Sequence, residues 1–200
     1  MLRRAARILI VAPLLLAGCA SSARLVAGDG SHRLIARDAQ SGVTVVLTTE
    51  SWSGDTAYGE DLTIVHMLVA NMGAEPVLLA PGDFVLRDRR GFRYVLYDAG
   101  GAFQAVPPGA DPGAWAGAEI GYDPGSTTDY ESVRTEDAEL GRLGLPWGVL
   151  LPGTQMRGFV YFEDVRDTAN HAVLEWHAQT PEHQPLAVFG FDLHVSRQKG

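Results

Sequence analysis

The stretch LTIVHMLVANMGAEPVLLAPGDFVLRDRRGFRY, residues 62–94, decides the fold class of this chain. Residues 62–70 are almost all apolar, and alternate positions from Val65 to Val69 fall on one face of a β-strand. Asn71 can end that strand, because its side chain hydrogen-bonds to nearby backbone and it tolerates the left-handed conformation. The stretch therefore predicts a buried strand that leads through a turn into further strands.

The same pattern of strand-forming runs separated by turn residues continues on both sides of this stretch. Short β-branched or apolar runs alternate with clusters of Gly, Pro, Asn and Asp, which is typical of strands joined by tight turns. A short helix over 135–142 is also expected, because Glu136 and Asp137 suit a helix N-terminus. With little helical periodicity elsewhere, the chain is predicted to be an all-β, antiparallel β-sandwich. The expected strands are 43–49, 62–70, 77–79, 84–88, 92–97, 155–163, 172–178 and 186–195.

Two segments carry a family resemblance. The first is 62–94, with a strand that ends in Asn, a short turn, a Pro-x-Asp-Phe strand and a glycine hairpin; the second is LLPGTQMRGFVYFEDV, residues 150–165. They resemble the secreted immunoglobulin-like domains of unknown function found on many bacterial lipoproteins. The resemblance implies an immunoglobulin-like antiparallel β-sandwich and little about function, because this scaffold hosts many roles. The positions that fit the pattern are Asn71, Pro81, Asp83, Phe84, Leu86 and Gly91.

The first residues have the layout of an export signal. Three arginines and no acidic residue lie within the first seven positions, and the apolar run at 8–17 is shorter than the ~20 residues that a membrane-spanning helix needs. The run ends in LAGC, residues 16–19, which contains the only cysteine of the chain and resembles the lipobox of bacterial lipoproteins. The resemblance implies that 1–18 are a signal peptide and that Cys19 is acylated, palmitate being among the chains that anchor it. Because Ala20 stands where Asp commonly marks inner-membrane retention, we expect the outer membrane, facing the periplasm.

Composition narrows the classes of partner. Removing 1–18 takes away three arginines and moves the formal charge from −8 to −11. Such an acidic domain argues against nucleic acid as a partner and against an electrostatic hold on anionic lipid headgroups. Residues 19–32 are expected to be a flexible lipidated tether, and 33–200 one immunoglobulin-like β-sandwich domain. Because the lipid uses Cys19, the domain is expected to contain no disulfide and no cysteine-ligated metal.

A long Gly/Pro-rich insertion lies between Asp98 and Trp147, about fifty residues where the resembled family has fewer. Its glycines and prolines are interleaved with the aromatic residues Trp115, Tyr122 and Tyr130. Long loops in compact domains are usually functional or disordered, so these aromatics are candidates for a partner-binding surface. The alternative, which the sequence favours, is that they pin the loop onto the edge of the sandwich.

Four of the six histidines fall in the last thirty residues. If 179–185 closes a hairpin between the last two strands, their outer faces coincide, because side chains alternate with a period of two. One permitted register then places His171 opposite His194, with Asp192 diagonal to His171. Two imidazoles and a carboxylate could hold Zn²⁺ or Cu²⁺. The alternative, again favoured, is a solvated face that happens to carry histidines, and no cofactor is predicted.

The sequence contains no common catalytic fingerprint. A nucleophile elbow, a zinc-protease helix, a P-loop, a dinucleotide-binding glycine pattern and an EF-hand loop are all missing from it. We therefore expect a protein that is not an enzyme, with a noncatalytic binding or structural role in the cell envelope. Its expected partners are the membrane, through Cys19, and an envelope protein. The alternatives are a metal- or small-ligand-binding lipoprotein and, after that, a hydrolase.

Overall fold

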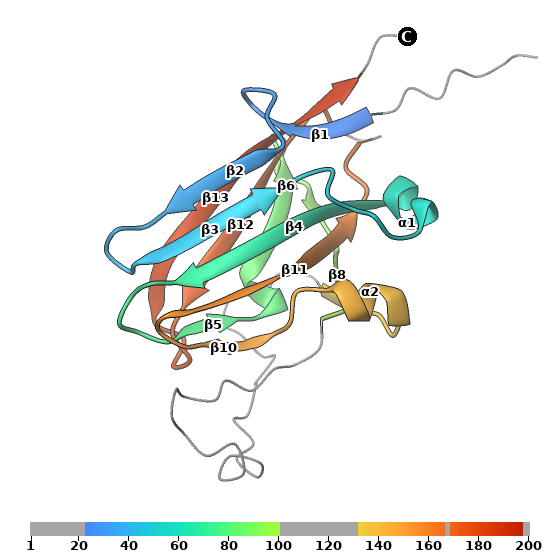
Figure 1. The fold of residues 1–200 in the computed structure, drawn as a ribbon. Helices are drawn as coiled ribbons and strands as arrows, with labels where there is room; N and C mark the ends of the chain where they lie inside the picture. The colour runs from blue at the N-terminus through green and yellow to red at the C-terminus, as the bar shows by residue number, and fades with distance from the viewer. Residues whose placement is uncertain (1–22, 101–131, 167–168, 198–200) are drawn as a thin grey trace, which may run out of the picture.

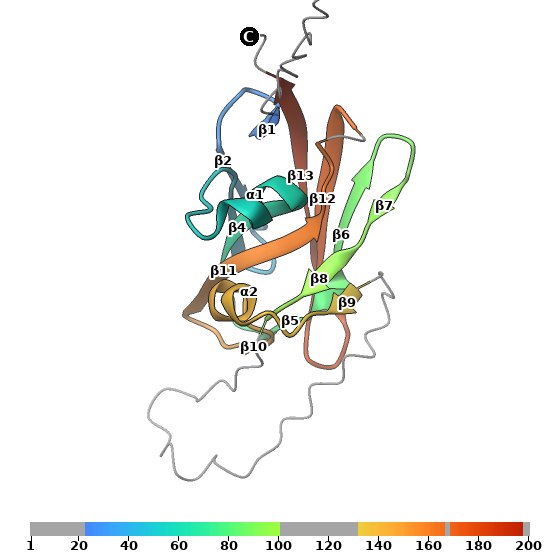
Figure 2. The ribbon, with the colours of Figure 1, turned by 90° about the vertical axis from the view of Figure 1, so that its right-hand side faces the viewer.

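The structure is a computed structural model that describes residues 23–100, 132–166 and 169–197. These residues form two β-sheets packed against each other, with two short helices at one end (Figure 1). Figure 2 shows the sheets from the side, with β6, β7, β12 and β13 in one layer and β2, β4, β8 and β11 in the other. The prediction of an all-β, antiparallel β-sandwich is confirmed. The immunoglobulin-like topology stays a prediction.

The seven-stranded sheet is built around β12, which pairs with β13 on one side and with β6 and β5 on the other. β13 then pairs with β1, β6 with β7, and β5 with β10. All of these pairs are antiparallel. The strands are β1 (Ala23–Ala27), β5 (Val77–Leu79), β6 (Phe84–Asp88), β7 (Arg93–Tyr94), β10 (Gly148–Leu150), β12 (His171–Gln179) and β13 (Pro185–Arg197).

The six-stranded sheet has the order β2-β3-β4-β11-β8-β9, antiparallel except for the parallel pair β8–β9. β4 and β11 form its long centre, since they pair over ten residues each. The strands are β2 (Arg33–Arg37), β3 (Val43–Thr48), β4 (Leu62–Asn71), β8 (Leu96–Asp98), β9 (Ser132–Arg134) and β11 (Thr154–Glu163). The helices are α1 (Thr56–Asp61) and α2 (Ala138–Leu143), and a 3-10 turn spans Pro81–Asp83.

The core between the sheets contains a ladder of three stacked rings. The register places Trp176 of β12 opposite both Phe84 of β6 and Phe189 of β13. The Trp176 ring stacks on Phe84 and on Phe189, with centroids 5.7 and 5.4 Å apart, and none of the three is more than 3% exposed. We call these three residues the inner ladder. Alternating Val65, Met67 and Val69 face it from β4 and are fully buried, as the sequence pattern predicts.

The expected single strand at 92–97 is wrong. Its first half is β7, which pairs with β6, whereas its second half is β8, which pairs with β11 in the other sheet. The chain crosses between the layers at Val95, whose backbone oxygen accepts a hydrogen bond from the Glu163 N–H at 2.9 Å. Both Tyr94 and Leu96 are buried, so hydrophobic alternation continues through the crossing and hides it from the sequence.

Asn71 ends β4 by a different route from the one predicted. Its φ is not in the left-handed region, where the only described non-glycine residues are Glu50 and His183. Its amide donates to the backbone oxygens of Glu75 and Leu150, and its side-chain oxygen accepts from the Gly73 N–H. The expected bonding to local backbone is therefore confirmed, whereas the left-handed conformation is not used. Asn71 is completely buried and ties the β4–β5 turn to β10.

The predicted flexible tether over 19–32 is wrong for its middle part, because 23–27 form β1. This strand pairs in register with the last strand, from Ala23 opposite Arg197 to Ala27 opposite Leu193. Leu25 and Ala27 are buried in the sandwich. The pairing partner lies about 170 residues away in the sequence, so the Ser/Ala/Gly-rich composition gave no local signal for it. The sandwich therefore begins only four residues after Cys19.

Candidate functional site

A second aromatic group lies on the outer face of the six-stranded sheet, at the end where the helices sit. Trp52, which follows β3, packs edge-on against Phe159 and Tyr161 of β11, with ring centroids 5.1 and 6.0 Å apart. Tyr58 of α1 lies edge-on to Trp52 at 6.4 Å. We call these four residues the outer cluster. Three of its members keep part of their surface exposed, and only Tyr161 is fully buried.

Polar contacts at the helix termini hold the outer cluster together. Asp137 caps α2 by accepting from the Glu139 and Leu140 N–H groups, and it also accepts the Tyr58 hydroxyl at 2.5 Å. This hydrogen bond raises the pKa of Tyr58 to about 12 and lowers the pKa of Asp137. A second contact joins the two helices, because the Glu139 carboxylate of α2 accepts a hydrogen bond from the N–H of Asp55, the residue that caps α1. Two short helices that are distant in sequence are therefore bound as one unit.

The indole of Trp52 is held in place by residues that closely follow it, Gly54 and Asp55. Its Nε1–H donates to the Asp55 backbone oxygen at 2.8 Å, and Gly54 packs against the ring. A β-carbon at Gly54 would lie 2.3 Å from the Trp52 Cζ2 atom, closer than such contacts occur. A side chain at position 54 would therefore displace the ring, so the glycine sets where the indole stands.

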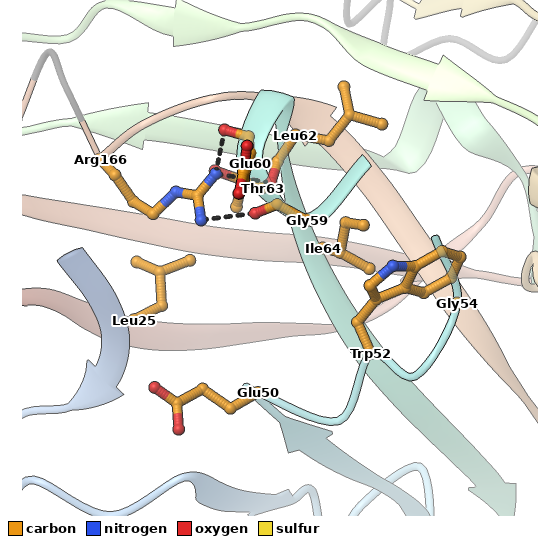
Figure 3. Close-up of a pocket in the computed structure, with 10 residues that line it drawn as sticks. All are labelled: Leu25, Glu50, Trp52, Gly54, Gly59, Glu60, Leu62, Thr63, Ile64 and Arg166. Carbon is orange, nitrogen blue, oxygen red and sulfur yellow. Dashed lines mark hydrogen bonds between the residues drawn. The ribbon is translucent and has the colours of Figure 1, made fainter. Parts of the chain in front are cut away.

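A hollow of about 450 Å³ opens beside Trp52, between β1, the segment after β3, α1 and the start of β4 (Figure 3). Leu25 of β1 and Ile64 of β4 line it with apolar surface, and Trp52 and Leu62 add to this. Figure 3 shows Leu25 and Trp52 on opposite sides of it, with Ile64 between them. The hollow combines three stretches that are far apart in the sequence: β1, residues 50–64 and Arg166.

Charged side chains surround this apolar surface. Glu50 and Glu60, both exposed, line the hollow. Arg166, after β11, also lines it, but its guanidinium bonds to the Asp164 carboxylate at 2.7 Å and to the backbone oxygens of Gly59, Glu60 and Leu62. The arginine therefore fastens α1 to the sheet. The hollow is therefore lined by the carboxylates of Glu50 and Glu60 and by this paired arginine.

Glu50 occupies an unusual backbone position. Its φ is 57°, in the left-handed region that a residue with a side chain enters at a cost of ~1–2 kcal/mol. Its carboxylate lies 3.5 Å from the His32 Nδ1, which carries a charge only when protonated. The strained conformation turns the chain between β3 and Trp52 and places the carboxylate beside the hollow.

The histidine pair predicted from the sequence is formed. His171 and His194 are register partners across β12 and β13, and their rings lie edge to face with centroids 4.8 Å apart. The His171 Nε2 lies 3.3 Å from an oxygen of Asp192, whose side chain is 71% exposed, whereas that of His171 is only 11% exposed. Burial is the main cause that lowers the pKa of His171, and nearby Arg89 and His194 lower it further.

Metal binding at this pair stays a prediction. A lowered pKa keeps the imidazole neutral, as a metal ligand must be. Among the described residues, however, no group of three or more His, Cys, Asp or Glu side chains is arranged to hold a metal ion. The described part of the chain therefore brings the two imidazoles together without completing a metal centre.

The aromatic candidates Trp115, Tyr122 and Tyr130 lie outside the described residues. The described ends of the insertion do show how it is attached. Gly100 packs beneath the Trp147 indole, whose Nε1–H donates to Asp98 at 2.6 Å. Of the expected helix at 135–142, α2 is present from Ala138, because Asp137 acts as the cap and does not join the helix.

Sequence reasoning missed Trp52, Glu50 and Glu60 altogether. Residues 53–55 are turn formers, which indicated only the end of the expected strand over 43–49. A weak signal was present: Asp55 precedes the α1 residues and caps them by accepting from the Ala57 N–H. Nothing in the local sequence indicated that β1 and Arg166 would close the other sides of the hollow.

Comparisons with protein-family models, with curated proteins and with solved structures find no match to this chain. In the described ranges, no helix is long and apolar enough to cross a membrane.

Proposed function

We propose that this protein is a lipid-anchored, noncatalytic binding protein of the outer membrane that faces the periplasm, and that the hollow beside Trp52 is its binding site. The lipobox-like LAGC sequence supports the anchor, and the apolar hollow with its fixed indole supports binding. The observation that carries the proposal is the start of β1 at Ala23. Three residues separate Cys19 from this strand, so a fully extended link reaches at most ~14 Å, and Leu25 of the same strand lines the hollow.

The anchor and the binding site are tested separately in cells. Radiolabelled palmitate should label the wild-type protein and leave Cys19→Ser unlabelled, because no other residue offers a thiol to the lipid. A photo-crosslinker placed at Ser53, an exposed residue beside the hollow, should trap an envelope component. The matched control is the same crosslinker at Gln184, exposed in the turn between β12 and β13. Palmitate in Cys19→Ser, or equal capture from both positions, would contradict the proposal.

Metal binding at His171 and His194 is the second candidate, favoured by their direct contact. A divalent ion that binds only the folded state would stabilise it by ~2.7 kcal/mol at a hundredfold excess over its dissociation constant. Zinc should then raise the melting temperature at pH 7.5 for the wild type and for His183→Ala, but not for His171→Ala. The increase should vanish near pH 5, where imidazoles are protonated. Absence of any increase in the wild type would remove this candidate.

A further inference from the structure

We propose that the turn between β6 and β7, residues 89–92, lies on a membrane surface that contains anionic phospholipids. The turn is a different surface from the hollow beside Trp52, and its contact with the membrane rests on the proposed lipid anchor. Three features of the described residues support the contact: the charge of the turn, its exposed aromatic ring and its place at the anchored end of the sheet.

Arginines gather at this turn although the domain as a whole is acidic. Four of them fall within seven residues: Arg87, Arg89, Arg90 and Arg93. Two carboxylates balance part of this charge, since Glu175 pairs with Arg87 at 2.6 Å and Asp88 pairs with Arg90 at 3.0 Å. Four arginines against two carboxylates leave a local excess of positive charge, which anionic headgroups attract. The net charge of the whole domain opposes such attraction, so the contact is confined to this turn.

A hollow of about 340 Å³ beside the turn is large enough for a headgroup phosphate. Its lining includes Arg89 and Asn170, both exposed, whose guanidinium and amide can donate hydrogen bonds to phosphate oxygens. Asp88 also lines the hollow, but its side chain is 3% exposed and accepts from the backbone N–H groups of Arg90 and Phe92. The aspartate therefore fixes the shape of the turn and presents little of its charge to a ligand.

Phe92 gives the same turn an apolar contact. It is 53% exposed, and its ring lies edge-on to Tyr94 with centroids 5.0 Å apart. Exposed aromatic rings beside basic side chains are typical of segments that lie in the membrane interface. Arginines keep their charged heads at the level of the phosphates while their stems lie along apolar surface. A turn that carries both kinds of side chain is suited to the boundary between headgroups and acyl chains.

The turn lies at the anchored end of the seven-stranded sheet. One row of paired residues joins the end of β6 to β1 and runs through Asp88, Ala172, Leu193 and Ala27. From this row, the turn and the first residues of β1 project in the same direction (Figure 2). Three residues separate Cys19 from β1, and a fully extended link reaches at most ~14 Å. The anchor therefore brings this end of the sheet, and the turn with it, close to lipid headgroups.

Contact through the turn also leaves the hollow beside Trp52 open to a partner. The helix α1, which borders that hollow, lies on the side of the six-stranded sheet, away from β6 and β7 (Figure 2). It carries the exposed carboxylates of Glu60 and Asp61, which anionic headgroups repel. Attraction at the turn and repulsion at α1 therefore favour the same orientation of the domain.

The test measures lipid crosslinking by the full chain in nanodiscs. The photo-crosslinking residue benzoylphenylalanine replaces Phe92, and the discs contain phosphatidylcholine alone or an equal mixture with phosphatidylglycerol. Mass spectrometry of the intact protein counts the attached lipid. We expect crosslinks to be at least ~5-fold more frequent with phosphatidylglycerol, because several arginines meet the anionic surface. The same crosslinker at Gln184, exposed in the turn between β12 and β13, should capture little lipid in either disc.

Arg89→Gln should lower the crosslinking yield at Phe92 by ~3–5-fold in the mixed discs, because it removes one charge that meets the headgroups. Arg37→Gln is the matched control. Arg37 is exposed and ends β2, whose tip points away from β1 in Figure 1. It carries the same change in net charge and should leave the yield within about twofold of the parent protein. Thermal melts confirm that both variants are folded. Equal losses would mean that only the overall charge matters, and would overturn the turn as the contact.

Two further outcomes would overturn the proposal. Crosslinks at Phe92 that are equally frequent in both kinds of disc would mean that the anchor alone brings the turn to lipid. Absence of lipid at Phe92 would mean that this turn does not reach the membrane. Neither outcome bears on the anchor, which palmitate labelling tests by itself through Cys19→Ser. Crosslinking that depends on phosphatidylglycerol, in a protein that palmitate does not label, would support the turn and contradict the anchor.

Discussion

The inner ladder and the outer cluster use the same kinds of side chain and are held in different ways. In the inner ladder, Trp176 stacks nearly parallel between two phenylalanines and is completely buried. Its Nε1 has no hydrogen-bond partner among the described residues. In the outer cluster, Trp52 makes edge-on contacts, is part exposed, and donates its Nε1–H to the Asp55 backbone oxygen.

This difference indicates that the inner ladder stabilises the fold, whereas the outer cluster is suited to binding. Stacked rings between two sheets are stabilised by removal of apolar surface from water, and the indole tolerates an unpaired N–H as the lesser cost. The outer rings are only partly removed from water, so hydrogen bonds at the caps of α1 and α2 must fix them. A part-exposed, rigidly oriented indole is the arrangement that interaction sites favour. The comparison predicts different sensitivities to mutation and to pH.

The largest effect should come from the inner ladder. Phe84→Ala removes a buried ring between Trp176 and Trp147 and should lower the free energy of unfolding by ~3–5 kcal/mol. Denaturant unfolding measures this loss. The control is Phe92→Leu, at a ring that is 53% exposed on the β6–β7 turn, which should change stability by ~0.5 kcal/mol or less. Equal losses would show that the ladder is not the core of the fold.

Trp52→Ala should have a smaller effect than Phe84→Ala. The ring is only partly buried, so we expect a loss of ~1–3 kcal/mol, together with loosening of α1 and α2. Hydrogen exchange should quicken in 56–61 and 138–143 while β12 and β13 keep their protection. Uniform acceleration across both sheets would mean that the outer cluster belongs to the same cooperative core, and the comparison would fail.

Gly54→Ala should move the Trp52 indole without removing a ring from the outer cluster. The new methyl would stand 2.3 Å from the Trp52 Cζ2 atom, so the indole must shift. We expect a loss of ~1–2 kcal/mol and a change in tryptophan fluorescence as the Trp52 indole moves. Ser53→Ala, at the exposed neighbouring position, is the control and should change neither quantity. A wild-type emission spectrum and wild-type stability in Gly54→Ala would show that the glycine does not set the position of the indole.

The smallest effect should come from Tyr58→Phe, which keeps the ring and removes the hydroxyl that Asp137 accepts. We expect the melting temperature to fall by about 2 °C at neutral pH. In the wild type, ultraviolet absorbance should detect a tyrosine that ionises near pH 12, and this titration should be missing from the variant. A wild-type protein whose tyrosines all ionise near their ordinary value of 10.0 would contradict the hydrogen bond.

The pH dependence of the same contact has a definite sign on each side. The pKa of Asp137 is lowered from 3.8, so its contribution to stability is present above that value and is lost as the pH falls through the lowered pKa. The pKa of Tyr58 is raised from 10.0 to about 12, so its contribution is present below 10 and is lost as the pH rises through about 12. The difference in melting temperature between wild type and Tyr58→Phe should therefore shrink at both extremes. A constant difference would mean that the hydroxyl bonds elsewhere.

Strands that are marked by alternating apolar residues and by flanking turn residues were predictable from the sequence. β3, β4, β5, β6, β11, β12 and β13 begin and end within two residues of the expected ranges, since alternation and turn residues mark them. Period-two alternation also predicted the contact of His171 with His194, because a hairpin with a short turn leaves few registers. The hollow was not predictable, since Leu25, the stretch 50–64 and Arg166 are three segments far apart in the sequence.

The sequence by itself determined which faces of the long strands are buried, that the protein is all-β, and that a short helix begins near Asp137. These follow from interactions between residues a few positions apart. Only the tertiary structure decided that 23–27 form a strand, that the chain changes sheets at Val95, and that Trp52 stands over a hollow. Each of these depends on a partner supplied from far along the chain: β13 for β1, β11 for β8, and the α2 cap for the outer cluster. A short segment with weak propensity takes the conformation that such a partner stabilises, so its own residues cannot specify it.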